Sequence, residues 1–226
     1  MRVLIAGASP EPEGEAFYRQ ELSAADFVVA ADAGAEWCVA HGRNPDLAVG
    51  DFDSAASGAR KRLRSAGVEV IEYPAAKDES DLDLAVTAAC ARGADFITLM
   101  ACSGGRLDHM LASLGTLLRA GAVLSADLQE PSFAAWPVGE RQGNGIRLDM
   151  ETGSVFSVFA IGEARDVAIS GAAFPLACAS LPSLSSLGLS NVAATTTVSV
   201  AVGGGQLVVI AQVRRDGPRP TLIPTS

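Results

Sequence analysis

The sequence predicts an N-terminal α/β domain, a Rossmann-like three-layer structure with a parallel sheet, followed by a smaller C-terminal antiparallel β-sandwich domain. Two observations lead to this prediction. The first half of the 226 residues alternates short apolar runs with helical patterns, which is typical of a parallel sheet covered by helices. After about residue 130 the charges thin out, and β-prone runs are separated by Gly- and Ser-rich turns. We therefore expect domains at residues 1–130 and 140–215, with a Pro- and Gly-rich linker within 128–145.

The apolar runs of the first half end in carboxylates. We expect strands at 2–7, 27–32, 47–53, 68–73 and 95–101. We expect helices at about 14–23, 34–41, 55–66, 81–92 and 107–120. Ligands of such sheets bind beyond the carboxyl ends of the strands. Asp32, Asp51 and Asp53 fall at predicted carboxyl ends, so we expect the functional site there.

The second half is predicted to be built from strands alone. The β-prone runs lie at 146–150, 154–161, 166–171, 194–202 and 206–213. The Pro-rich tail after residue 213 is expected to be frayed.

The charge balance narrows the function classes. The 26 acids exceed the 17 bases, giving a formal net charge of −9, and residues 1–130 carry the whole excess. An acidic domain repels a bare phosphate backbone, so we expect no nucleic-acid partner, although a divalent metal would allow phosphates to bind. No apolar stretch reaches the roughly 20 residues of a membrane helix, and the first residues lack a signal-peptide pattern. The four cysteines are scattered, and we expect a cytoplasmic enzyme.

Gly50-Asp51-Phe52-Asp53-Ser54 is the strongest local signal. Its two carboxylates stand two residues apart at the end of an apolar strand, where a turn can bring them together. Two close like charges are unfavourable unless they share a cation, and oxygen ligands of this kind suit Mg²⁺. The alternative is a helix cap plus one solvated acid. The residues alone leave both interpretations open.

Lys77-Asp78-Glu79-Ser80-Asp81-Leu82-Asp83 precedes the fourth helix and is the second signal. Ser80 or Asp81 would cap that helix, and acids in its first turn complement the helix dipole. Capping accounts for Asp83 but does not require Lys77. A lysine beside metal-bound carboxylates would suit a phosphoryl group in transfer.

Ser103-Gly104-Gly105-Arg106-Leu107-Asp108-His109 lies between a predicted strand and helix. Backbone amides at a Gly-Gly turn before a helix form an anion site, and Arg106 adds a bidentate phosphate donor. An ordinary strand-to-helix turn is the alternative. The chain has neither a P-loop nor the G-x-G-x-x-G fingerprint, so phosphate binding does not use those cradles.

Taken in order, these segments resemble the thiamine pyrophosphokinase family. Asp32-Ala33-Gly34-Ala35 corresponds to the family's Asp-Gly-Gly-Ala turn, and Gly50–Ser54 to its Gly-Asp-Phe-Asp-Ser. Lys77–Asp81 corresponds to Lys-Asp-x-Thr-Asp, and Gly104–His109 to Gly-Gly-Arg-x-Asp-His. Leu189-Ser190-Asn191 resembles the family's Ser-Asn turn. The likeness covers roughly residues 2–213, and four motifs in order are specific.

The resemblance implies a homodimeric enzyme that transfers the diphosphate of ATP to the hydroxyl of thiamine, giving AMP and thiamine diphosphate. The implied Mg²⁺ ligands and catalytic residues are Asp51, Asp53 and Asp81. Either one of these three or Asp78 would accept the proton of the thiamine hydroxyl. The implied nucleotide site consists of Asp32, Lys77, Asp78, Ser80, Arg106, Asp108 and His109. Ser190 and Asn191 are carried over as thiamine contacts.

Three positions depart from the family pattern. Ala33 replaces a Gly, Ser80 replaces a Thr but keeps the hydroxyl, and Ser113 stands where the family often has Asn. None of these changes removes a carboxylate or the arginine.

Two other functions stay open. An apolar strand followed by Asp-x-Asp also begins aspartyl-phosphate phosphatases, in which Asp51 would be the nucleophile. Ala55 stands where such enzymes usually have Thr or Val. A non-catalytic nucleotide- or thiamine-binding module is the third possibility, and it would show ligand-induced stabilisation without turnover.

Overall fold

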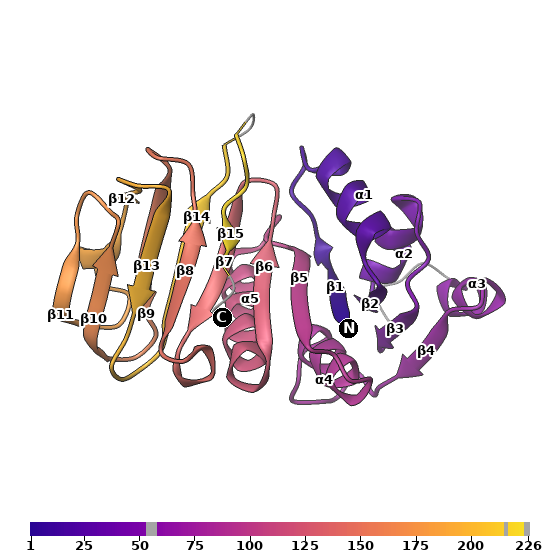
Figure 1. The fold of residues 1–226 in the computed structure, drawn as a ribbon. Helices are drawn as coiled ribbons and strands as arrows, with labels where there is room; N and C mark the ends of the chain where they lie inside the picture. Colours follow the sequence, from indigo (N-terminus) through magenta and orange to yellow (C-terminus); the bar gives the residue numbers. More distant parts are fainter. Residues whose placement is uncertain (53–57, 215–216, 224–226) are drawn as a thin grey trace. The chain divides into compact units, whose positions relative to one another are not determined.

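The computed structural model describes residues 1–52, 58–214 and 217–223. The chain forms two compact units. The first contains Met1–Ala120 and Leu128–Pro131, and the second contains Gly121–Asp127 and Ser132–Ser226. Figure 1 shows the helices α1–α5 together with the strands β1–β5, whereas no α-helix is described between β7 and β15. The division of the chain into functional domains at residues 1–130 and 140–215 stays a prediction.

Five parallel strands form the sheet of the first unit. They are β1 (Arg2–Ser9), β2 (Phe27–Ala31), β3 (Leu47–Gly50), β4 (Glu69–Glu72) and β5 (Phe96–Cys102). Their order is β5-β1-β2-β3-β4, and every pair is parallel. The central strands are buried along nearly their whole length, as expected for a sheet covered on both faces.

Helices cover both faces of this sheet. They are α1 (Glu15–Ala24), α2 (Gly34–Ala40), α3 (Ala59–Ser65), α4 (Asp81–Ala91) and α5 (Leu107–Val123). On one face, Leu4 and Val28 pack with Leu22 of α1, Cys38 of α2 and Leu63 of α3. The helix α4 contacts β1, β2 and β3. This arrangement confirms the predicted three-layer α/β fold.

Two antiparallel sheets make up the second unit. Its strands are β7 (Phe133–Val138), β8 (Gly145–Asp149), β9 (Val155–Ala160), β10 (Ala164–Ser170), β11 (Leu176–Leu181), β12 (Asn191–Val192), β13 (Thr197–Ala201), β14 (Leu207–Gln212) and β15 (Thr221–Leu222). One sheet has the order β12-β9-β14-β7 and the other β11-β10-β13-β8-β15. Two short 3₁₀ helices, η1 (Glu140–Gln142) and η2 (Ser186–Gly188), lie between strands.

The two sheets of the second unit enclose a common apolar core. Alternate residues of β9 are buried, among them Phe156 and Val158, and they join one cluster with Trp136 of β7 and with Ile169 and Val200 of the facing sheet. A period of two along each strand is what a sheet with one buried face requires. The predicted β-sandwich is confirmed.

The segment predicted to hold the linker forms strands instead. The strand β6 (Ser125–Gln129) is followed by β7, in which Pro137 pairs with Val208. The Pro and Gly residues hid these strands, because proline is unusual inside a sheet. The tail also differs from expectation, since β15 pairs with β8. None of the helices that the structure describes is both long and apolar enough to cross a membrane.

Candidate functional site

Two of the predicted carboxylates lie side by side where β2 and β3 end. Asp32 follows β2, and its backbone N–H donates to the carbonyl of Val49 in β3 at 2.8 Å. Asp51 follows β3 directly. Asp32 and Phe52 have φ of 47° and 57°, in the left-handed region. Such conformations cost roughly 1–3 kcal/mol each and concentrate at functional sites. The strain redirects the chain at this edge of the sheet.

Asp81 completes a group of three acids. It is the first residue of α4, and its carboxylate joins those of Asp32 and Asp51, with one oxygen of each lying within 4.8 Å of the others. All three are partly buried. Three chain segments separated by 19 and 30 residues therefore meet at one point. Asp53, the other predicted ligand, lies outside the described residues.

Lys77 is the cation of this group. Its Nζ lies 2.9 Å from Asp81 Oδ1 and 3.5 Å from Asp51 Oδ2, and its side chain is only 12% exposed. Burial lowers the pKa of Lys77, but Asp81 and Asp51 outweigh that effect and raise it. Burial raises the pKa of Asp81, as do the charges of Asp32 and Asp51, and Lys77 opposes them. The acids are thus held close at an electrostatic cost that a cation relieves.

The donor set fits a hard divalent cation. Opposite ligands of an octahedral Mg²⁺ stand about 4.2 Å apart. Three carboxylate oxygens within 4.8 Å of one another need only small side-chain movements to reach that geometry. Magnesium commonly takes one or two protein carboxylates and completes its shell with water and phosphate oxygens. Asp32, Asp51 and Asp81 are the described residues that would hold it.

Other residues of the Lys77–Asp83 segment serve the helix. Ser80 is the N-cap of α4 and accepts the N–H of Asp83 at 3.2 Å. Asp83 accepts from Thr116 Oγ1 at 2.7 Å and from Arg119 at 2.6 Å, which ties α4 to α5. Asp78 is exposed. The hydroxyl of Ser80, predicted to line the nucleotide site, is therefore already used by the helix cap.

The turn between β5 and α5 depends on two glycines. A Cβ on Gly104 would lie 2.0 Å from the carbonyl oxygen of Pro10, and Gly105 has a φ of 101°. The N–H of Gly104 donates to Ser9 O at 2.7 Å. Only glycine fits both positions without displacing backbone. This turn, which we call the Gly-Gly turn (residues 103–105), is thereby held against the loop after β1.

Arg106 and Asp108 pair with each other at the start of α5. Two guanidinium nitrogens of Arg106 donate to the two carboxylate oxygens of Asp108 at 3.1 and 2.5 Å. The pair lowers the pKa of Asp108 to about 2. Both side chains are more than 60% exposed, and His109 is exposed as well. Arg106 is accessible to a phosphate, which would compete with Asp108 for the guanidinium.

The Gly-Gly turn and the three acids share one edge of the sheet. The turn follows β5, and Asp32 follows β2, with only β1 between these strands. Two strand spacings amount to about 10 Å. The edge therefore presents a glycine turn at a helix start and a candidate cation site at a separation that an extended nucleoside triphosphate can bridge.

The sequence motifs did not identify Glu130, a buried acid that bonds to Cys102, the residue before the Gly-Gly turn. Glu130 follows β6, has no exposed surface and accepts from Tyr18 Oη and from the N–H of Cys102, both at 2.6 Å. The segment before it, residues 125–129, reads Ser-Ala-Asp-Leu-Gln and is not an apolar run, so the pattern that singled out Asp32 gave no signal for Glu130.

The Ser-Asn turn lies in the second unit. Ser190 has a φ of 56°, and its N–H donates to Ser157 Oγ at 3.1 Å. The buried amide of Asn191 donates to Phe174 O at 2.7 Å and accepts from Phe174 N at 3.0 Å. Asn191 thus clamps the loop that carries Phe174, whose side chain is 67% exposed. The amide of Asn191 shapes this surface through backbone contacts.

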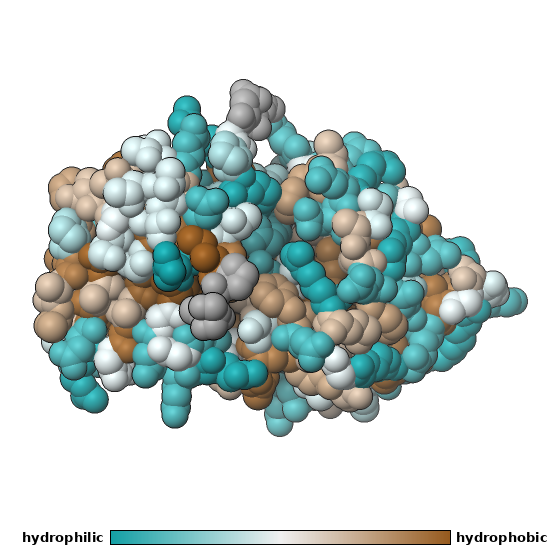
Figure 2. All heavy atoms as spheres, in the orientation of Figure 1, coloured by the Kyte–Doolittle hydropathy of each residue, from teal (hydrophilic) through white to brown (hydrophobic). Residues whose placement is uncertain are grey.

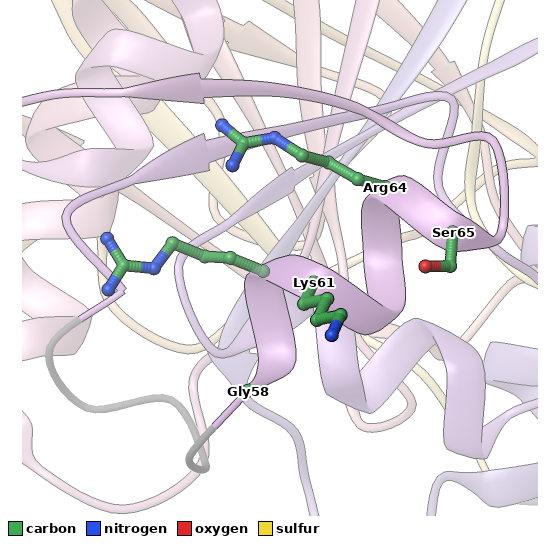
Figure 3. A pocket seen from close by; sticks show the side chains of 5 residues that line it. Gly58, Lys61, Arg64 and Ser65 are labelled. Atoms are coloured by element: carbon green, nitrogen blue, oxygen red, sulfur yellow. The ribbon is translucent and has the colours of Figure 1, made fainter.

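A separate hollow of about 510 Å³ lies along α3. Figure 3 shows its lining, which consists of Gly58, Arg60, Lys61, Arg64 and Ser65. Arg60 and Arg64 both bond to Glu72 of β4, at 2.9 and 2.5 Å. The hollow is basic and is lined by none of the residues that the motifs predicted.

Residues 18–126 match the model of one protein family, the thiamin pyrophosphokinase catalytic domain. Over 75 residues the chain is 39% identical to the thiamine pyrophosphokinase of Bacillus subtilis strain 168. That alignment covers 33% of this chain and 35% of the relative, so it spans about a third of the relative's length. The resemblance carried by the four motifs is confirmed.

Solved structures of thiamin pyrophosphokinases share the fold of the whole chain. The Bacillus subtilis enzyme superposes with a TM-score of 0.77 at 21% identity, covering 94% of this chain and 99% of its own. The Candida albicans enzyme gives the same TM-score at 13% identity, covering 94% and 89%. The two-domain fold predicted from the sequence is that of these enzymes.

Proposed function

We propose that this chain is a thiamine pyrophosphokinase, which transfers the diphosphate of ATP to the hydroxyl of thiamine and releases AMP. The observation that carries the proposal is the meeting of Asp32, Asp51 and Asp81 around Lys77. The match of residues 18–126 to the family's catalytic domain supports it. Three acids beside a partly buried lysine suit metal-assisted phosphoryl chemistry, in which positioning and charge neutralisation supply most of the catalysis.

In this proposal Mg²⁺ is held by Asp51 and Asp81, with Asp32 as the further ligand that the geometry adds. Asp53 stays a predicted ligand from the same motif. When bound, the metal neutralises charge on the phosphates and so favours attack on the β-phosphorus. Lys77, now paired with two of the acids, would turn to the phosphates once the metal balances those acids.

The chain's own groups would orient the triphosphate. The N–H of Gly105 and the first amides of α5, a helix of 17 residues, receive a phosphate. Arg106 exchanges Asp108 for a phosphate oxygen, and His109 lies beside it at the rim. The thiamine hydroxyl then attacks the β-phosphorus and gives its proton to one of the carboxylates of Asp51, Asp53, Asp81 or Asp78. The bond between the β-phosphorus and the oxygen that it shares with the α-phosphorus breaks, and AMP leaves with that oxygen.

We place thiamine binding and self-association in the second unit. Ser190 and Asn191 hold the surface beside Phe174 there. Phe174, Leu184 and Leu187 are each more than half exposed, and Figure 2 shows apolar atoms at the surface among polar ones. Apolar surface of this kind favours a protein interface, so we propose a homodimer. The free cysteines agree with a cytoplasmic location.

A product assay tests the reaction. The purified chain is incubated with ATP, Mg²⁺ and thiamine, and nucleotides and thiamine esters are separated by chromatography. We expect equal amounts of AMP and thiamine diphosphate. ADP with thiamine monophosphate would identify an ordinary kinase, and thiamine-independent phosphate release would identify a phosphatase. Either result would overturn the proposal, as would binding without turnover.

A matched pair of variants ties the reaction to the acids. Asp51→Asn should lower AMP formation roughly a hundredfold or more, because one ligand of the cation is lost. Asp26→Asn makes the same change at an exposed residue before β2, at the opposite edge of the sheet, and should keep wild-type turnover. Equal activity in the two variants would remove the assigned role of Asp51.

A further inference from the structure

Glu130 is a buried acid that none of the motifs contains. It follows β6 at the boundary of the first unit and has 0% exposed surface. One carboxylate oxygen accepts the hydroxyl of Tyr18 from α1, and the other accepts the N–H of Cys102 at the end of β5, each at 2.6 Å. The backbone of Ser103 adds a further hydrogen bond. A single carboxylate thus joins α1 to the end of β5 through hydrogen bonds.

The bonds to α1 and β5 both reach the edge of the sheet that we assign to phosphate binding. Cys102 ends β5 directly before the Gly-Gly turn, and Ser103 is the first residue of that turn. Tyr18 Oη in turn accepts the N–H of Glu11, in the loop after β1, at 2.8 Å. Ser103 Oγ in turn donates to Glu11 Oε1 at 3.1 Å, so these hydrogen bonds form a closed ring. We call this hydrogen-bonded set (Glu11, Tyr18, Cys102, Ser103 and Glu130) the carboxylate clamp.

We propose that Glu130 is a positioning residue for the nucleotide, whose ionised carboxylate holds the Gly-Gly turn in the arrangement that receives a phosphate. This inference rests on the proposed function for the identity of the nucleotide. The clamp fixes the start of the turn through the backbone of Cys102 and Ser103, and the bond from Gly104 to Ser9 fixes its middle. Amides held in advance bind an anion without paying to order the loop.

The clamp requires the charged form of Glu130. Tyr18 and two backbone N–H groups all donate to this carboxylate. Protonation removes the charge that strengthens these three hydrogen bonds and fills one of the carboxylate's lone-pair sites, so the clamp loosens. The titratable groups that face Glu130 are Tyr18 from α1, Glu11 from the loop after β1 and Cys102 from β5. Burial raises the pKa of Glu130 to about 7, and the charge of Glu11 adds to this, whereas the hydrogen bonds oppose it.

The test measures nucleotide binding separately from turnover. Binding of a non-hydrolysable ATP analogue with Mg²⁺ is followed by calorimetry at pH 6, 7 and 8, for the wild type and for Glu130→Gln. At pH 8 we expect the variant to bind roughly tenfold more weakly, the factor that corresponds to one charge-assisted hydrogen bond. The ratio of the two affinities should fall toward one at pH 6, where the wild type is protonated. Titration of the analogue cancels in this ratio.

The same pair of proteins is compared in the product assay. Glu130→Gln should raise the KM for ATP more than it lowers kcat, because the turn positions the nucleotide and takes no part in bond breaking. Glu13→Gln, the same substitution at an exposed residue of the loop before α1, should match the wild type. An affinity ratio that stays constant between pH 6 and 8 would overturn the inference, as would an unchanged KM in Glu130→Gln.

A second variant covers the case in which Glu130→Gln does not fold. Tyr18→Phe removes the phenol donor and keeps the ring. Because the Tyr18 hydrogen bond lowers the pKa of Glu130, this variant should move the midpoint of the pH-dependent affinity upward. An unmoved midpoint contradicts the inference. The two proposals fail separately: pH-dependent analogue binding without thiamine diphosphate formation would refute the reaction alone.

Discussion

Replacing Glu130 should remove a loss of stability that the wild type undergoes as pH rises. Burial raises the pKa of this carboxyl from its ordinary 4.5 to about 7. Between these values the folded state holds a proton that the unfolded state has released, so folding is favoured at low pH and weakened as pH rises. The full difference corresponds to about 3 kcal/mol. Glutamine carries no such charge, so the stability of Glu130→Gln relative to the wild type should increase by about 3 kcal/mol between pH 5 and pH 8.

Chemical unfolding measures this difference in the first unit. Trp37 lies in that unit and Trp136 in the other, so both proteins carry Trp136→Phe and are followed by Trp37 fluorescence in urea. Any cost of the amide's hydrogen bonds is independent of pH and drops out of the comparison. Glu72→Gln provides a control whose stability relative to the wild type should stay nearly constant over this pH range, because Arg64 and Arg60 lower the pKa of Glu72 from 4.5 and its stabilisation is lost only at lower pH.

A stability difference between Glu130→Gln and the wild type that does not change from pH 5 to pH 8 would refute this reasoning. The predicted result has a functional meaning as well. A buried carboxylate whose charge weakens the fold as pH rises but strengthens nucleotide binding serves function at the expense of stability.

Three further substitutions have outcomes that the structure fixes. Gly104→Ala places a Cβ 2.0 Å from Pro10 O, so the KM for ATP in the product assay should rise at least tenfold while far-ultraviolet circular dichroism stays unchanged. Asp83→Ala removes the bonds from α5 to α4 and should lower the free energy of unfolding by about 1–2 kcal/mol in urea titrations, with turnover at saturating ATP preserved. Asn191→Ala removes both bonds to Phe174 and should lower the unfolding free energy by about 2 kcal/mol and speed protease cleavage next to Phe174.

The positions of the acids were predictable because they depend on local patterns. Apolar runs that end in Asp32 and Asp51 indicate strands, and parallel strands end at one edge of a sheet. Ser80 followed by Asp83 marks the start of α4, which places Asp81 in its first turn. The topology of the sheet predicts that the three acids converge, but it does not predict the distances between their carboxylate oxygens.

The remaining features depend on contacts between distant residues. Tyr18 and Glu130 are 112 residues apart, and no local pattern pairs a tyrosine of one helix with an acid after another strand. Pro137 was expected in a linker, yet it lies in β7 and pairs with Val208 of β14. The Ala33 departure is also explained only by structure. Ala33 has the right-handed φ of −61°, and Asp32 takes the left-handed conformation, so this turn has no need of a second glycine.

Binding of a divalent cation is the sharpest test of the metal site formed by Asp32, Asp51 and Asp81. Mn²⁺ replaces Mg²⁺ in such oxygen sites and is followed by electron paramagnetic resonance, with the wild type, Asp51→Asn and Asp26→Asn titrated in the presence of the ATP analogue. The account predicts tight Mn²⁺ binding by the wild type and Asp26→Asn, and at least tenfold weaker binding by Asp51→Asn. Equal Mn²⁺ affinity in all three proteins would show that the acids at the ends of β2 and β3 and at the start of α4 do not hold the cation.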